Sequence, residues 1–145
     1  MKPFALENVL KHRQRLEDLA QNKFIQAKEI ADTIRKRYVT KQKELQKLIK
    51  TIETKQQLGI DITMLIWYQD QINQEGENLS AIKKNLKEKE RLVEQMLQNL
   101  LTKTQERQVM EQLKVEQNKA WRKHLEKKEA MMLDKIAVMR HGKEI

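Results

Sequence analysis

The residues best suited to chemistry near neutral pH are three histidines, His12, His124 and His141, because imidazole both transfers protons and binds metal ions. They lie far apart and have no partner at the spacing of a metal site, and the sequence contains no HExxH motif. No glycine-rich phosphate loop occurs, and the chain has no cysteine that could act as a nucleophile. We therefore interpret the histidines as surface residues. We expect no catalytic residue, no metal site, no cofactor and no small-molecule substrate.

The most basic segment is the run "IRKRYVTKQK", residues 34–43, which could contact a phosphate backbone. Its single aromatic residue, Tyr38, falls at a position that we expect to be buried, so base-stacking platforms are missing. Residues 1–58 carry 14 Lys and Arg against 7 Asp and Glu, whereas residues 59–145 carry 16 against 14. This basic first half favours an anionic partner, which could be an acidic protein channel, a membrane surface or, less favoured, nucleic acid.

The composition predicts few, long helices. Of 145 residues, 35% are charged and 4% are aromatic, and only three glycines and one proline are available to reverse the chain. The apolar residues recur periodically, which argues against disorder. The N-terminal segment is too polar for a signal sequence, and no window is apolar enough to cross a membrane. We expect a soluble, cytoplasmic, all-α protein.

A first helix is predicted over about residues 4–57, beginning at Phe4. Its apolar positions mostly follow coiled-coil spacing, and the step from Ile34 through Tyr38 to Lys41 adds one residue to a strict heptad. Lys23 and Lys41 fall in this seam, which is therefore poor. The seam positions are Leu6, Val9, Leu16, Ala20, Ala27, Ile30, Ile34, Tyr38, Leu45, Leu48 and Ile52.

A bend is predicted at about residues 58–62, because Gly59 can end one helix in the left-handed conformation and Asp61 can cap the next. The second helix, about residues 62–140, has a cleaner pattern and then loosens through Met110 and Leu113 until Gly142 ends it. Its heptad positions are Leu65, Ile72, Leu79, Leu86, Val93 and Leu100, with Tyr68, Ile82 and Met96 on the complementary position. We expect a single domain over residues 1–145, a long two-helix antiparallel coiled-coil hairpin.

The two predicted helices have unequal lengths, about 80 Å and 120 Å at the α-helical rise, so the second extends about 40 Å beyond the first. Residues 121–140 then have no intramolecular partner, although they contain Trp121, Leu125, Met132, Ile136 and Met139. Such an exposed end predicts a docking surface, with a homodimer seam or simple fraying as alternatives. Near the bend, Trp67 and Tyr68 either plug the tip or form a recognition patch.

The two ends of the chain resemble the flagellar export protein FliJ family, whose relatives include the YscO group of virulence secretion systems. The segment "FALENVLKHRQRLEDLAQNKFIQA" is similar to the start of that family. The segment "EQLKVEQNKAWRKHLEKKEAMMLDKIAVMRH" is similar to its end, and "LIWYQDQI" occupies the place of the family's tip segment. Lys135 stands where the family usually has an acidic residue. The matching positions of the C-terminal segment are Leu113, Lys114, Glu116, Trp121, Glu129, Leu133, Asp134, Ile136 and Ala137.

The resemblance implies a stalk-like protein that docks in the pore of the hexameric export ATPase, promotes its assembly and activity, and meets the export gate membrane protein and export chaperones. It also implies a location at the cytoplasmic face of the inner membrane, at the flagellar basal body. Trp67, Tyr68 and Ile72 are the expected gate or chaperone contacts. The expected ATPase-docking residues are Trp121, Arg122, Lys123, Leu125, Lys127, Glu129, Met132, Leu133, Asp134, Ile136, Met139 and Arg140.

Two other interpretations fit the same pattern. The chain could be a structural coiled coil that homodimerises through its C-terminal helix, in which case its mass in solution would depend on concentration. It could also be a basic nucleic-acid binder, in which case its affinity would fall steeply with salt. The stalk interpretation instead predicts a chain that is monomeric when free.

Overall fold

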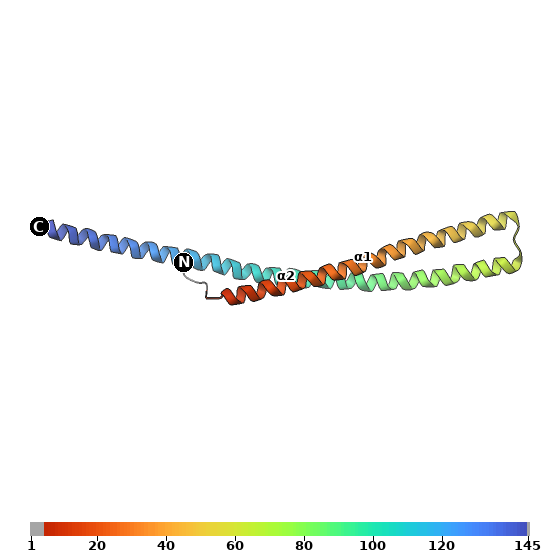
Figure 1. The fold of residues 1–145 in the computed structure, drawn as a ribbon, viewed down its shortest axis with the longest axis horizontal. Coiled ribbons are helices and arrows are strands. Elements are labelled where there is room, and N and C mark those ends of the chain that lie inside the picture. Colours follow the sequence, from red (N-terminus) through yellow and green to blue (C-terminus); the bar gives the residue numbers. More distant parts are fainter. Residues whose placement is uncertain (1–4, 145) are drawn as a thin grey trace. The chain divides into compact units, whose positions relative to one another are not determined.

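A computed structural model of the chain describes residues 5–144 and contains two helices and, among these residues, no strand (Figure 1). Helix α1 spans Glu7–Leu58 and helix α2 spans Ile62–Glu144. The predicted all-helical architecture is therefore confirmed. Phe4, where the first helix was expected to begin, lies outside the described residues. Helix α2 passes through Gly142, which was expected to end it. No described helix is apolar over a stretch long enough to cross a membrane.

Residues 59–61 connect the two helices, and their backbone explains why the chain turns here. Gly59 has φ of 85°, the left-handed region that an L side chain rarely adopts, and its N–H donates to the Gln56 carbonyl at 3.3 Å. Asp61 occupies the position before α2, where its carbonyl accepts from the Leu65 N–H at 3.0 Å. Helix α1 thus stops just before the first glycine of the chain, and α2 starts within one turn.

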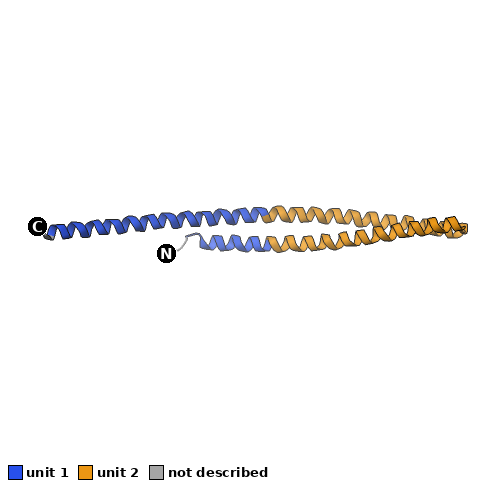
Figure 2. Ribbon diagram, turned by 90° about the horizontal axis from the view of Figure 1, so that it is seen from above, with its two compact units in different colours: residues 1–19, 101–145 blue, residues 20–100 orange. Residues whose placement is uncertain are grey.

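The chain divides into two compact units, each built from a segment of both helices (Figure 2). Unit 2 contains residues 20–100, with the connection between the helices. Unit 1 contains residues 1–19 and 101–145. Both helices run without interruption from one unit into the other, and the expectation of a single domain stays a prediction.

In unit 2 the seam of α1 follows a strict alternation of three- and four-residue steps. Ala31 is 2% exposed and belongs to this seam, whereas the neighbouring Ile30 is 47% exposed and points outward. The predicted extra residue near Tyr38 is therefore wrong, and so is the seam position of Lys23, since the half-buried Phe24 takes that place. The buried and half-buried seam residues are Ala20, Phe24, Ala27, Ala31, Ile34, Tyr38, Lys41, Leu45, Leu48 and Ile52.

The α2 segment of unit 2 carries the predicted heptad on its packed face. Tyr68 and Leu86 are buried, and the other seven predicted positions between residues 65 and 100 are half-buried. Two polar contacts fix the direction of the helices, because Lys55 bonds to Tyr68 near the connection and Arg35 bonds to Glu90 at 3.0 Å further away. Contacts that move backward along α1 while they move forward along α2 are those of antiparallel helices.

Unit 1 packs the start of α1 against residues 101–121 of α2, with a small apolar core and several ionic contacts. Leu10 and Met110 are its buried apolar side chains. The Arg107 Nε lies 2.8 Å from a Glu17 carboxylate oxygen. Lys114 pairs with Glu7 at 3.0 Å. Polar contacts therefore fix much of the register in this unit.

Candidate docking surface

The segment that we call the overhang comprises residues 122–142 of α2, and every one of its side chains is exposed. The ion pair of Glu7 with Lys114 marks the level at which α1 begins, and the half-buried Trp121 lies about two turns further along α2. In unit 1 the α2 segment continues beyond the described α1 segment (Figure 2). The expectation that the C-terminal part of α2 has no cover from α1 matches this exposure.

An apolar stripe runs along one side of the overhang. Leu125, Met132, Ile136 and Met139 are each between 44 and 66% exposed. At about 100° per residue these four and Trp121 fall within roughly 60° of the helix circumference. They therefore form one continuous line of side chains, which we call the apolar stripe.

The apolar stripe does not continue the seam that packs against α1. In unit 1 that seam follows Arg107, Met110, Lys114, Gln117 and Trp121, in steps of three and four residues. Extending the same steps would bring His124, Lys128, Met131, Lys135 and Val138 onto the seam. Apart from Trp121, which belongs to both, each stripe residue instead lies one position further along the chain than an extended seam position. The overhang therefore has its own register.

Further apolar side chains lie outside the stripe. Leu133, a predicted docking residue, lies on one flank, and Met131 and Val138 lie well around the other side. Their exposed fractions run from 60 to 72%. Met131 and Val138 were not among the predicted docking residues, although their type and position in the sequence could have identified them. The overhang is thus apolar around much of its circumference.

The charged side chains of the overhang divide by face. Arg122, Glu129 and Arg140 flank the apolar stripe at about 55 to 75°, whereas Lys123, Lys127 and Asp134 lie on the far side of the helix. Lys128 and Lys135, which were not predicted, lie about as close to the stripe as its other flanking charges. Within the described part of the chain none of these charges forms an ion pair with another residue. All of them are available to a partner.

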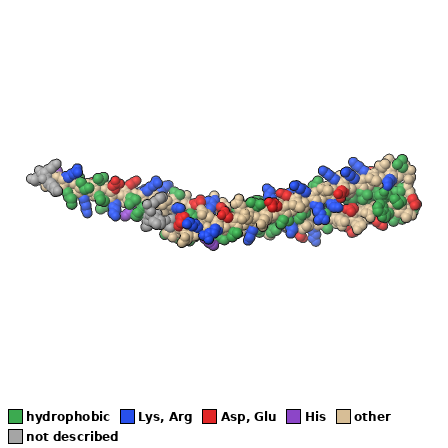
Figure 3. Space-filling view, viewed as in Figure 1, with side chains coloured by type: hydrophobic (Ala, Val, Ile, Leu, Met, Phe, Trp, Pro, Cys, Tyr) green, Lys and Arg blue, Asp and Glu red, His purple; other side chains and the backbone are tan. Residues whose placement is uncertain are grey.

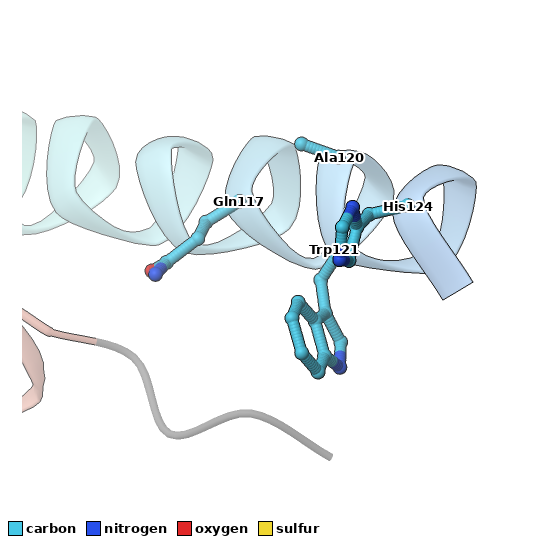
Figure 4. A pocket seen from close by; sticks show the side chains of 4 residues that line it. All are labelled: Gln117, Ala120, Trp121 and His124. Atoms are coloured by element: carbon cyan, nitrogen blue, oxygen red, sulfur yellow. The ribbon is translucent and has the colours of Figure 1, made fainter. Parts of the chain in front are cut away.

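A shallow groove lies at the base of the overhang, lined by Gln117, Ala120, Trp121 and His124. The rings of Trp121 and His124 stack with centroids 5.5 Å apart and an interplanar angle of 28°. Figure 4 shows the Gln117 and Trp121 side chains pointing to the same side of α2. The Gln117 Oε1 atom is buried, and none of the described residues donates a hydrogen bond to it. A donor supplied by a partner could satisfy it.

Near the connection, the three predicted contact residues have different surroundings. Trp67 is 53% exposed, Ile72 is half-buried, and Tyr68 is 8% exposed. Lys55 donates a hydrogen bond to the Tyr68 hydroxyl and its ammonium lies 4.8 Å from the ring centroid. The Trp67 and Tyr68 rings meet edge to face at 5.1 Å. Tyr68 therefore packs in the seam and supports Trp67, and only Trp67 of the pair offers a broad surface.

The model of a protein family described as flagellar FliJ protein matches residues 1–144, which is almost the whole sequence. The chain belongs to the FliJ family. The resemblance deduced from the two ends of the sequence is confirmed, and it makes the chain a component of the flagellar export apparatus. No curated protein and no solved structure matches the chain significantly.

The proteins of the FliJ family are structural components of the export apparatus and are not known as enzymes. The described residues contain no group of three His, Asp or Glu side chains that could hold a metal ion. His12, His124 and His141 are exposed, each on a different stretch of helix. The candidate surfaces among the described residues are exposed faces of the two helices.

Proposed function

We propose that the chain acts as a central-stalk-like component of the flagellar export apparatus, whose overhang docks in the pore of the export ATPase hexamer and promotes ring assembly and ATP hydrolysis. The observation that supports this role is the exposure of every side chain from residue 122 to 142, seven of them large and apolar. Surfaces of this kind in water are docking sites or sources of aggregation. Membership of a family of flagellar export apparatus proteins supports a partner within that apparatus.

The distribution of side chains around the overhang favours a partner that encloses it. A helix that packs on one neighbour needs one apolar face and a polar remainder. Here the apolar stripe has Leu133 on one flank and Met131 and Val138 on the other side, while charges occupy the remaining positions. A ring pore contacts a helix on all sides, so it can use both sets. Methionine suits such a contact because its flexible side chain adapts to irregular surfaces.

The far-side charges are consistent with the same arrangement. Lys123, Lys127 and Asp134 would face solvent if the overhang packed on a single helix, but they would face the opposite wall of a pore. Glu129, Arg122 and Arg140 would add ionic contacts beside the apolar stripe. The groove at Gln117 and Trp121 would lie at the pore entrance, where α1 begins.

The proposed gate and chaperone contacts lie around the connection between the helices in unit 2, near the middle of the sequence. Trp67 supplies the exposed ring, Tyr68 holds it in place through the seam, and Ile72 extends the apolar contact along α2. Leu58, Ile62 and Ile66, which the sequence did not single out, add exposed apolar surface beside them. This surface would meet the export gate membrane protein or an unloaded export chaperone at the cytoplasmic face of the inner membrane, at the basal body.

The experiment is a titration of the export ATPase of the same flagellar system, with hydrolysis rate and hexamer fraction measured together. The full chain should raise both, and a chain ending at Ala120 should raise neither. Because truncation is a coarse change, a second variant in the full chain replaces Leu125, Met132, Ile136 and Met139 by serine. Its matched control carries serine at four exposed apolar positions of comparable size elsewhere, Val39, Leu92, Leu101 and Val109.

Loss of stimulation with the stripe variant and its retention in the control would support docking through the overhang. Full stimulation by the chain ending at Ala120 would refute it. A chain whose mass in solution rises with concentration, and whose association disappears in the stripe variant, would instead identify the overhang as a homodimer seam. Circular dichroism of each variant verifies that the helices are retained.

A further inference from the structure

A row of lysines lies on the outer face of α1 in unit 2. Lys36, Lys43, Lys47 and Lys50 are spaced by seven, four and three residues, and all four are exposed. At about 100° per residue they fall within roughly 60° of the circumference, opposite the seam that packs on α2. We call these four residues the lysine row. Figure 3 shows Lys and Arg side chains along the outward edge of α1 as it approaches the connection.

The charge of the lysine row is not neutralised by its neighbours. Two nearby carboxylates are already engaged, since Asp32 pairs with Arg35 at 2.7 Å and Glu44 pairs with Lys41 at 3.4 Å. None of the four lysines forms an ion pair with any described residue. Four adjacent ammonium groups on one face repel one another, so holding them together without counter-charge costs free energy. An external anion removes this cost.

Exposed apolar residues continue the same face at the connection. Leu58 lies on the side of α1 that carries the lysine row, and its side chain is 82% exposed. Ile62, Ile66 and Trp67 follow at the start of α2, each more than half exposed. A cationic row that leads into an exposed apolar tip with a tryptophan combines the two contributions that hold a protein on a lipid surface.

We propose that the lysine row and the apolar tip at Leu58 bind the surface of an anionic phospholipid bilayer, a property beyond the proposed stalk function. All four cations are lysines, which interact with phosphate as point charges and need no fixed partner geometry, whereas arginine suits bidentate pairing with carboxylates. A straight row on one face brings every ammonium to the same depth above a flat surface. The apolar tip then enters the headgroup region, with Trp67 at the interface.

The same residues fit two other anionic partners less well. Nucleic acid binding would favour exposed aromatic side chains for stacking, but the one aromatic residue in this part of α1, Tyr38, is half-buried in the seam. An acidic polypeptide would account for the lysine row but not for the exposed Leu58 and Ile62 that continue it, whereas a membrane surface beside the gate protein accounts for both. The described helices contain no segment that could span a membrane, so the binding that we propose is peripheral.

The expected effect follows from the electrostatics of anionic membranes, in which each lysine near the surface contributes about fivefold in affinity. Neutralising the whole row should weaken binding several hundredfold. The test uses sedimentation of the full chain with vesicles of one part phosphatidylglycerol to two parts phosphatidylcholine, and with vesicles of phosphatidylcholine alone. The variant carries Lys36→Gln, Lys43→Gln, Lys47→Gln and Lys50→Gln.

A matched control keeps the same change in net charge on another face of unit 2. The control variant carries Lys83→Gln, Lys84→Gln, Lys87→Gln and Arg91→Gln. These four positions are exposed on α2 and lie among Glu88, Glu90 and Glu94. The lysine-row variant should lose binding to the anionic vesicles, whereas this control should retain most of it. In a chain with Trp121→Phe, the fluorescence of Trp67 should shift to the blue on vesicle binding. Leu58→Ser should reduce binding at least about tenfold, because tenfold is the lower end of what burial of a leucine side chain contributes.

Four results would overturn the proposal. Equal loss in the two quadruple variants would mean that net charge alone drives association, and equal binding to neutral vesicles would mean that the row is not involved. Absence of binding to anionic vesicles at low salt would reject a lipid partner. Binding of poly-glutamate through the row without vesicle binding would identify an acidic polypeptide as the partner instead.

Discussion

The ion pair between Glu17 and Arg107 should determine how firmly α1 is held at the base of the overhang. The Glu17 side chain is 18% exposed and the Arg107 side chain is 23% exposed, and their bonded atoms are 2.8 Å apart. Arg107 also bonds to Glu111 at 2.8 Å, so its guanidinium is already oriented before it meets α1. Because Arg107 is held in place by Glu111 and both partners are partly shielded from solvent, this pair should contribute about 1 kcal/mol to stability, the upper end of the range for surface ion pairs.

The substitution Glu17→Gln keeps the shape of this side chain and removes its charge. A loss of about 1 kcal/mol from the local opening free energy should accelerate amide hydrogen exchange in residues 7–19 about fivefold. Exchange near the connection, in residues 62–72, should be unchanged because those amides belong to unit 2. A double-mutant cycle with Arg107→Gln, monitored by the same exchange, should return the coupling directly.

A second ion pair provides the comparison. Arg35 and Glu90 also join α1 to α2, at 3.0 Å, but their side chains are nearly half exposed. Their coupling should be smaller than that of Glu17 and Arg107, and it should fall further with added salt. Unaltered exchange in residues 7–19 of Glu17→Gln, or a coupling no larger than that of the exposed pair, would show that ionic contacts do not hold this end of α1 in place.

Two further predictions test the electrostatics and the register. The hydrogen bond and the charge of Arg107 lower the pKa of Glu17 from its ordinary value of 4.5. The stabilisation is therefore complete above pH 4.5 and is lost as the pH falls through the lower pKa of the folded state. Acidification should increase amide hydrogen exchange in residues 7–19 more in the natural chain than in Glu17→Gln. Ala31→Leu should overpack the seam and lower the free energy of unfolding by about 1 to 3 kcal/mol, whereas Ile30→Ala should lower it by less than about 0.5 kcal/mol. Urea unfolding measures both, and a larger loss for Ile30→Ala would contradict the observed register.

The register of α2 could be predicted from sequence because large apolar residues recur every seven positions. The register of α1 could not be predicted so well, because its seam contains Ala20, Ala27 and Ala31, which a search for large apolar side chains passes over in favour of Ile30. Small residues at these positions let two helices approach closely, so α2 selects the alanine face. Periodicity identifies a helix face, but the partner decides which of two adjacent faces is buried.

The candidate site was predictable in outline and less so in detail. The unequal lengths of the two helices, together with the bend at Gly59, were enough to predict an uncovered end of α2. They could not assign single charges, because proximity in sequence places Lys123 and Lys127 beside the apolar stripe although they lie across the helix from it. Near the connection, the heptad predicted that Tyr68 lies on the packed face, but the hydrogen bond from Lys55 to its hydroxyl is a contact between helices that no local pattern encodes.

The offset between the seam and the apolar stripe bears on the choice between a docked stalk and a homodimer. A second helix that continued the heptad seam of unit 1 along the overhang would meet His124, Lys128 and Lys135, and burying unpaired ammonium groups in such a seam is costly. A partner that uses the apolar stripe must instead approach about one residue, or roughly 100°, further around the helix. The seam between the two helices therefore does not extend into the overhang. Lys128 and Lys135, which would oppose such an extension, remain available to a partner at the edge of the apolar stripe. A ring with an apolar pore and acidic groups around it would cover the apolar stripe and also neutralise the lysines beside it. A second copy of this basic chain would not neutralise them.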